Sequence, residues 1–125
     1  MLQHILMVAV GGAFGSLCRY GLSMGVYSLL GREFPWGTAF VNLVGCFLFG
    51  LVWVMAEEKN MIPEEYRILI LVGFLGGLTT FSTFVFESSG LIHHGDWLRF
   101  GLNVMAQNIL GLMALYLGFS LGRLL

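Results

Sequence analysis

The stretch that decides the fold is Gly73–Phe84, GFLGGLTTFSTF, which lies inside a hydrophobic segment running from Ile68 to Ile92. Its glycines lose more backbone entropy in a helix than other residues do, and its four short hydroxyl side chains compete for backbone hydrogen bonds. In a bilayer, a broken helix persists only where its freed backbone groups are buried in protein or line an aqueous cavity. The stretch therefore predicts a helix break with a functional site beside it; a helix kinked for close packing is the alternative interpretation.

The composition of the whole chain indicates an integral membrane protein. Its 125 residues are 58% hydrophobic and only 10% charged, whereas soluble domains are about 25% charged. A single domain, residues 1–125, is expected at this length. The net charge of −1 and the scattered Lys and Arg residues give no basic surface for nucleic acid. No nucleophile, base and orienting group form a recognisable set, so an enzyme is not expected.

Four apolar segments are long enough to cross about 30 Å of hydrocarbon as helices surrounded by lipid. They are expected at residues 5–30, 36–56, 68–92 and 97–122. The predicted fold is therefore all-α, with four transmembrane helices, the third of them broken in mid-membrane.

The positive charges predict insertion in both orientations. Four spans put both termini on one side of the membrane, and the two sides carry three against two or three Lys and Arg residues. These residues are Lys59, Arg67 and Arg123 on the terminal side, and Arg32, Arg99 and, if it is counted, Arg19 on the other. Because a difference in Lys and Arg normally fixes orientation, a difference near zero predicts dual topology. A chain inserted both ways can pair with its own inverted copy.

Four motifs make the chain similar to the small bacterial fluoride channels of the Fluc (CrcB-type) family. They are GGAFGSLCRY in the first span, WGTAFVNLVG in the second, GFLGGLTTFSTF followed by Glu87 in the third, and NILG in the fourth. The resemblance covers nearly the whole length. It implies an antiparallel homodimer in the bacterial inner membrane, with two fluoride pores and a structural sodium ion at the dimer interface. It also implies passive fluoride export that reduces fluoride toxicity in the cytoplasm.

The chemistry of fluoride selects residues within these motifs. A small, heavily hydrated anion needs hydrogen-bond donors and weakly positive surfaces in place of water. Asn42 supplies amide donors, and Phe81 and Phe84, three residues apart on one helical face, offer the positive edges of their rings. For the asparagine the alternative is a packing contact between helices, and for the rings it is ordinary aromatic packing. Further donors are expected from Thr38, Ser82, Thr83 and Asn108.

Four other residues have expected roles of a different kind. Gly76 and Thr79 match positions whose backbone carbonyls bind sodium in the family; water or hydroxyl groups are alternative partners for these oxygens. Arg19 either attracts anions to a vestibule or extends to the lipid headgroups. Glu87 matches the family glutamate. Because a carboxylate repels anions, we expect Glu87 to organise the helix or to couple to conduction rather than to bind fluoride.

The fourth span departs from the family pattern. Val104 and Leu112 stand where relatives often have Tyr and Ser or Thr, which leaves either a polar path through Gln107 and Asn108 or altered conduction. Two other functions are alternatives to a channel: a proton-coupled fluoride carrier and a four-span dual-topology multidrug exporter. The exporter needs a membrane-embedded acid early in the chain, and no acid occurs before Glu33.

Overall fold

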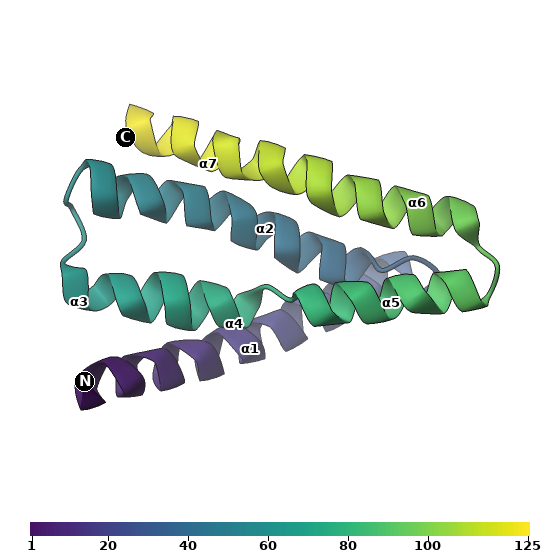
Figure 1. Ribbon diagram of the computed structural model, residues 1–125, viewed down its shortest axis with the longest axis horizontal. Coiled ribbons are helices and arrows are strands. Elements are labelled where there is room, and N and C mark those ends of the chain that lie inside the picture. Colours follow the sequence, from purple (N-terminus) through teal and green to yellow (C-terminus); the bar gives the residue numbers. More distant parts are fainter.

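The computed structural model describes residues 1–125 and is all-helical (Figure 1). Four long helical stretches follow one another along the chain, and each is long and apolar enough to cross a membrane. They are Leu2–Leu30, Trp36–Glu58, Glu64–His93 and Trp97–Leu124. Both termini lie at one end of the molecule, together with the connection between the second and third stretches (Figure 1). The prediction of an all-α chain with four membrane-length helices is confirmed.

The stretches are built from shorter elements, three of which have the wider π-helical hydrogen-bond pattern. The elements are α1 (Leu2–Leu30), α2 (Trp36–Trp53), η1 (Val54–Glu58), α3 (Glu64–Arg67), η2 (Ile68–Leu75), α4 (Gly76–Leu78), α5 (Phe81–His93), α6 (Trp97–Met105), η3 (Ala106–Leu110) and α7 (Gly111–Leu124). The second and third stretches are longer than expected because much of the polar segment between them is helical. Its acidic residues end η1 and begin α3 directly after Pro63, a residue that favours helix starts.

Two glycine contacts bring the helices together. The most extensive helix contacts are between α2 and α7 and between α1 and η2. A Cβ atom on Gly118 would overlap the carbonyl oxygen of Phe47 in the first contact, and one on Gly15 would overlap that of Phe74 in the second. The backbones therefore touch at positions where only glycine fits, a contact typical of membrane helices.

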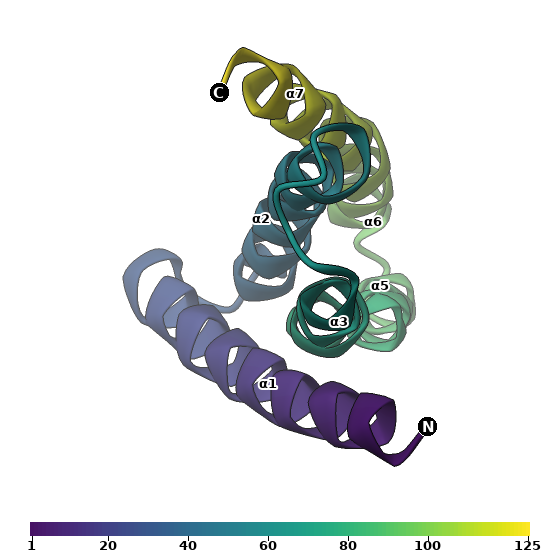
Figure 2. The same ribbon diagram turned by 90° about the vertical axis from the view of Figure 1, so that its left-hand side faces the viewer.

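The helices form an open arrangement rather than a closed bundle. Figure 2 looks along the molecule from the end with both termini, and α7 and α1 lie on opposite sides of α2 and the third stretch. Only 21 of the 125 residues are buried, and large apolar side chains such as Phe14 and Leu117 face outwards. Exposed apolar faces of this extent suit lipid tails or a partner chain.

The third stretch is interrupted at Thr79 and Thr80. Helix α4 ends at Leu78 and α5 begins at Phe81, and the backbones of both threonines are extended, with φ −91° and ψ 155° at Thr79 and φ −149° and ψ 117° at Thr80. In a continuous helix the Thr80 N–H would donate to the carbonyl of Gly76. It donates instead to Asn42 Oδ1 of α2, at 2.8 Å. A hydrogen bond to α2 thus replaces one backbone hydrogen bond within the third stretch.

Candidate functional site

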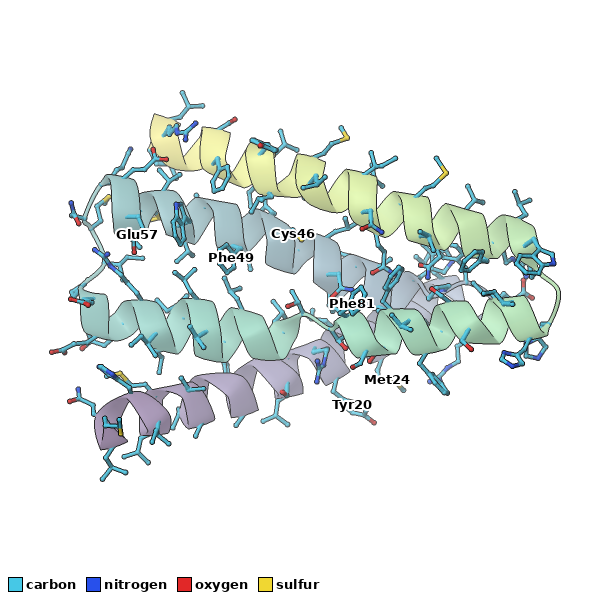
Figure 3. All side chains as sticks on the ribbon, in the orientation of Figure 1. Tyr20, Met24, Cys46, Phe49, Glu57 and Phe81 are labelled. Carbon is cyan, nitrogen blue, oxygen red and sulfur yellow. The ribbon has the colours of Figure 1, made fainter.

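A groove of about 400 Å³ lies beside the interruption, between α2, the third stretch and the fourth. Figure 3 shows Cys46 and Phe49 along α2 and Phe81 next to the interruption. Polar groups from three stretches, among them Asn42, Thr80 and Gln107, line the groove together with apolar side chains. The groove therefore combines a mostly apolar wall with a few convergent polar groups, as binding sites usually do.

Asn42 is held by the interruption itself. Its Oδ1 accepts from the Thr80 N–H at 2.8 Å, and its Nδ2 donates to the Thr80 carbonyl at 3.0 Å. Because the Thr80 N–H needs an acceptor, this pair of bonds fixes which way the amide faces. The Nδ2 group also donates to Gln107 Oε1 at 2.7 Å. Both Nδ2 hydrogens of Asn42 are therefore occupied.

The hydrogen bonds continue from Asn42 into the fourth stretch and back to α5. Gln107 Nε2 donates to Asn103 Oδ1 at 2.8 Å, and Asn103 Nδ2 donates to Ser88 Oγ at 2.9 Å. Asn103 is 0% exposed and Ser88 is 6% exposed. We refer to Asn42, Gln107, Asn103 and Ser88 as the amide chain. Since buried polar groups are stable only when they are paired, this chain fixes the positions of three helices relative to one another.

The two phenylalanines meet at the groove but differ in burial. The ring centroids of Phe81 and Phe84 are 5.7 Å apart, and both rings line the groove. Phe84 is 8% exposed and Phe81 is 76% exposed. The Phe81 ring therefore has most of its surface free to contact lipid, a partner chain or a passing ion.

Thr38 and Glu87 lie together in a second place. The Tyr27 hydroxyl donates to Glu87 Oε1 at 2.8 Å and lies 3.3 Å from Thr38 Oγ1. Glu87 Oε2 is buried and has no hydrogen-bond partner. We refer to Tyr27, Thr38 and Glu87 as the Glu87 cluster. Tyr27 and Glu87 also line a hollow of about 520 Å³ whose wall includes Arg32 and Arg99.

The remaining predicted residues have separate positions. Arg19 Nη1 donates to the Thr79 carbonyl at 3.2 Å, so the guanidinium lies at the interruption, a position that neither interpretation from the sequence anticipated. Thr80 Oγ1 donates to Thr83 Oγ1 at 3.0 Å and lies 3.4 Å from Ser82 Oγ, at the start of α5. Asn108 lines the groove, but its Nδ2 donates to the carbonyl of Val104 one turn earlier, at 2.7 Å.

The structure adds Asn103, Ser88 and Tyr27 to the residues singled out from the sequence, and it shows that Gln107, named there as part of an alternative polar path, accepts a hydrogen bond from Asn42. One signal was available: Asn103 and Gln107 are four residues apart, which puts them on one helical face. Ser88 and Tyr27 had no such signal. Their partners lie in other helices, and a single sequence does not tell which helices meet.

The fold and the site define a multi-pass membrane protein with polar groups gathered at a helix interruption. A family model described as "CrcB-like protein, Camphor Resistance (CrcB)" matches residues 6–119, and the chain belongs to this family.

Similar proteins cover the chain almost from end to end. A protein of Solidesulfovibrio magneticus is 51% identical over 100% of both chains, and one of Nitrosococcus oceani is 46% identical over 100% of both. A third, from Maridesulfovibrio salexigens, is 48% identical over 99% of this chain and 98% of its own. Each of the three is named "Fluoride-specific ion channel FluC". The named relatives are channels rather than enzymes, in agreement with the expectation from the sequence.

Proposed function

We propose that this protein is a fluoride-selective channel of the bacterial inner membrane, which lets fluoride leave the cell passively and so reduces fluoride toxicity in the cytoplasm. The observation that carries the proposal is the groove at the interruption, where Asn42, Phe81 and Phe84 meet. The 51% identity to a protein named as a fluoride channel gives it independent support.

The chemistry of the groove suits a small anion. The Asn42 amide offers an N–H donor when the Gln107 oxygen is displaced from it, and the edges of the Phe81 and Phe84 rings are weakly positive. Together they replace water around fluoride without a full positive charge, which would bind the ion too tightly for rapid release. Ser82, Thr83 and Asn108 add donors nearby, whereas Thr38 lies beside Tyr27, outside the groove.

The functional unit that we propose is an antiparallel homodimer of oppositely inserted chains, with the interruption near the middle of the membrane. The open arrangement and the outward-facing apolar side chains support a partner. Positive charge is similar at the two ends, and acidic residues partner it at both: Arg67 with Glu57 at one end, and Arg99 with Glu33 at the other. Reporters fused after Leu125 should show both orientations. A single uniform orientation would contradict the dimer model.

We also propose a sodium ion between the two copies, bound by backbone carbonyls of Gly76 and Thr79. Two observations support this fit. The Gly76 carbonyl loses its helical donor because the Thr80 N–H bonds to Asn42, and the Thr79 carbonyl accepts from Arg19 alone. A carbonyl oxygen has two lone pairs, so the Thr79 oxygen keeps one beside its bond from Arg19. Such oxygens are suitable ligands for a hard cation, and an inverted copy would double their number.

The sodium proposal has a test that does not depend on transport. Replacing sodium by N-methylglucamine should lower the melting temperature of the purified dimer. Thr79→Ser should keep this sodium dependence, because the proposed ligand is the backbone carbonyl rather than the side chain. A melting temperature that is the same in both cations would overturn the proposed site.

Fluoride efflux from proteoliposomes tests the function itself. The channel predicts rapid efflux that is insensitive to an imposed proton gradient. Efflux that follows the gradient would instead identify a proton-coupled fluoride carrier. Transport of organic cations without fluoride efflux would identify the multidrug exporter.

A further inference from the structure

The hydrogen bonds of the amide chain all run in one direction from donor to acceptor, and the backbone of Thr80 sets this direction. The Thr80 N–H fixes Asn42 Oδ1 toward the interruption, so Asn42 Nδ2 faces the fourth stretch. Gln107 must then turn its oxygen toward Asn42, and its Nε2 toward Asn103. Asn103 in turn donates to Ser88. In this state the only acceptor that Asn42 meets across the groove is the side chain of Gln107.

The same chain can run the other way beyond Asn42. If the carboxamides of Gln107 and Asn103 each turn over, Ser88 Oγ–H donates to Asn103 Oδ1, and Asn103 Nδ2 donates to Gln107 Oε1. A hydroxyl can donate as well as accept, so the chain keeps both of its bonds between Gln107 and Ser88. Amide groups have nearly the same shape in either orientation. The reversal therefore needs no movement of the helices.

The reversed chain creates a binding place for an anion. Gln107 Nε2 now faces Asn42 Nδ2, and two N–H donors pointing at each other repel unless an acceptor lies between them. Asn42 cannot turn away, because its two bonds to the Thr80 backbone anchor it. An anion between the two nitrogens satisfies both donors, and hydrogen bonds to a charged acceptor are stronger than neutral ones.

We propose that the Gln107 side-chain oxygen occupies the place of the transported anion at Asn42 until the anion displaces it. Reversal of the amide chain then opens a two-donor anion site between Asn42 and Gln107. This inference rests on the proposed function and adds a mechanism to it. Without an anion the chain returns to its first direction, and the Gln107 oxygen takes the place of the ion at Asn42. The exchange of one acceptor for another lets the ion bind and leave without exposing an unpaired amide.

Nitrogen NMR can observe the reversal directly. The protein has two glutamines, Gln3 and Gln107, so side-chain labelling of glutamine gives two amide signals. We expect the Gln107 signal of the dimer in lipid to shift on addition of fluoride, and to remain unchanged on addition of the same concentration of chloride. Gln107→Leu assigns the signal, and Gln3 is an internal control.

A pair of charge-matched variants separates reversal from simple electrostatics. In Asn103→Asp the ionised side chain only accepts hydrogen bonds, so it holds Gln107 in the first direction and blocks the site. In Asn108→Asp the same charge lies on the groove wall, but the replaced amide bonds only to its own helix. We expect Asn103→Asp to lower fluoride flux about tenfold or more, because one charge-assisted hydrogen bond to the ion is lost. Asn108→Asp should lower it less.

A third variant distinguishes a loss of flux caused by misfolding from one caused by a blocked anion site. Asn103→Leu cuts the chain but leaves Gln107 free to turn, so flux should stay closer to wild type than in Asn103→Asp. Wild-type flux without a fluoride response of Gln107, or an effect of Asn108→Asp as large as that of Asn103→Asp, overturns the inference alone. A wild-type protein that carries no fluoride overturns the proposed function, and the inference with it.

Discussion

Glu87 and Ser88 are neighbours on α5, yet they belong to two polar regions with opposite properties. Ser88 ends the amide chain, in which every member has a hydrogen-bond partner. Glu87 has one donor, the Tyr27 hydroxyl, and its second oxygen is buried without a partner. Amides carry both donors and acceptors and can satisfy one another, whereas a carboxylate only accepts. The amide chain can therefore rearrange with its own groups, while the Glu87 cluster depends on a donor, proton or cation from elsewhere.

The largest effect is expected from removing the head of the amide chain. Asn42→Leu leaves the Thr80 N–H, the Thr80 carbonyl and Gln107 Oε1 without partners, at about 1–3 kcal/mol for each buried group left unpaired. We expect fluoride flux in liposomes to fall to background and the melting temperature of the dimer to drop.

Asn42→Asp is the matched control for this change. It keeps an acceptor for the Thr80 N–H, so it should lose less stability than Asn42→Leu while still losing flux, because it has no N–H donors. Flux close to wild type in both variants would show that the amide chain only packs the helices.

The second prediction concerns the ring pair beside the amide chain. Phe81→Ile and Phe84→Ile keep bulk but remove the ring edge, so both should lower fluoride flux strongly if the rings face the ion. Their stabilities should differ, because Phe84 is 8% exposed and Phe81 is 76% exposed. We expect Phe84→Ile to cost about 1–2 kcal/mol of unfolding free energy and Phe81→Ile close to none. Equal loss of stability with intact flux would make both rings packing residues.

The sequence was a good guide to what depends on local properties. The four spans follow from apolar segments of membrane length. Glycines and short hydroxyl side chains, which both disfavour a helix interior, marked the stretch in which Thr79 and Thr80 are extended. The hydrogen-bond partners of the polar side chains were harder to predict from the sequence. The sequence named both Gln107 and Asn108 for a polar path in the fourth span, but only Gln107 bonds Asn42, because a shift of one residue turns a side chain by about 100° around a helix.

Long-range contacts of the charged residues could not be foreseen for the same reason. Arg19 donates to the Thr79 carbonyl across sixty residues, and Tyr27 donates to Glu87 over the same separation. Which helices meet is decided by close backbone contacts such as that of Gly15 with Phe74. A pattern within one segment identifies a small-residue face but not the helix that packs against it.

The third prediction compares two variants of the Glu87 cluster. Glu87→Gln replaces an acceptor-only group by a neutral amide of the same shape, so the cost of burying an incompletely paired charge disappears. The unfolding free energy should stay the same or rise by about 1 kcal/mol. Tyr27→Phe removes the only donor to Glu87 and should lower it by about 1–3 kcal/mol. Thermal unfolding of both purified dimers measures the difference. A greater loss in Glu87→Gln would mean that the negative charge itself is bound by a partner in the assembled protein.

The smallest effect is expected at Thr38, which tests whether the two regions are as separate as their hydrogen bonds indicate. Thr38→Val keeps the shape of this buried side chain and removes only its hydroxyl, which lies 3.3 Å from the Tyr27 hydroxyl. The stronger bond from Tyr27 to Glu87, at 2.8 Å, stays intact. Stability should therefore change by only about 0.5 kcal/mol. Because Thr38 does not line the groove of the amide chain, fluoride flux should also remain close to that of wild type. A strong loss of flux at unchanged stability would instead put the Thr38 hydroxyl on the fluoride path, as the sequence predicted, and would join the Glu87 cluster and the groove into one continuous route.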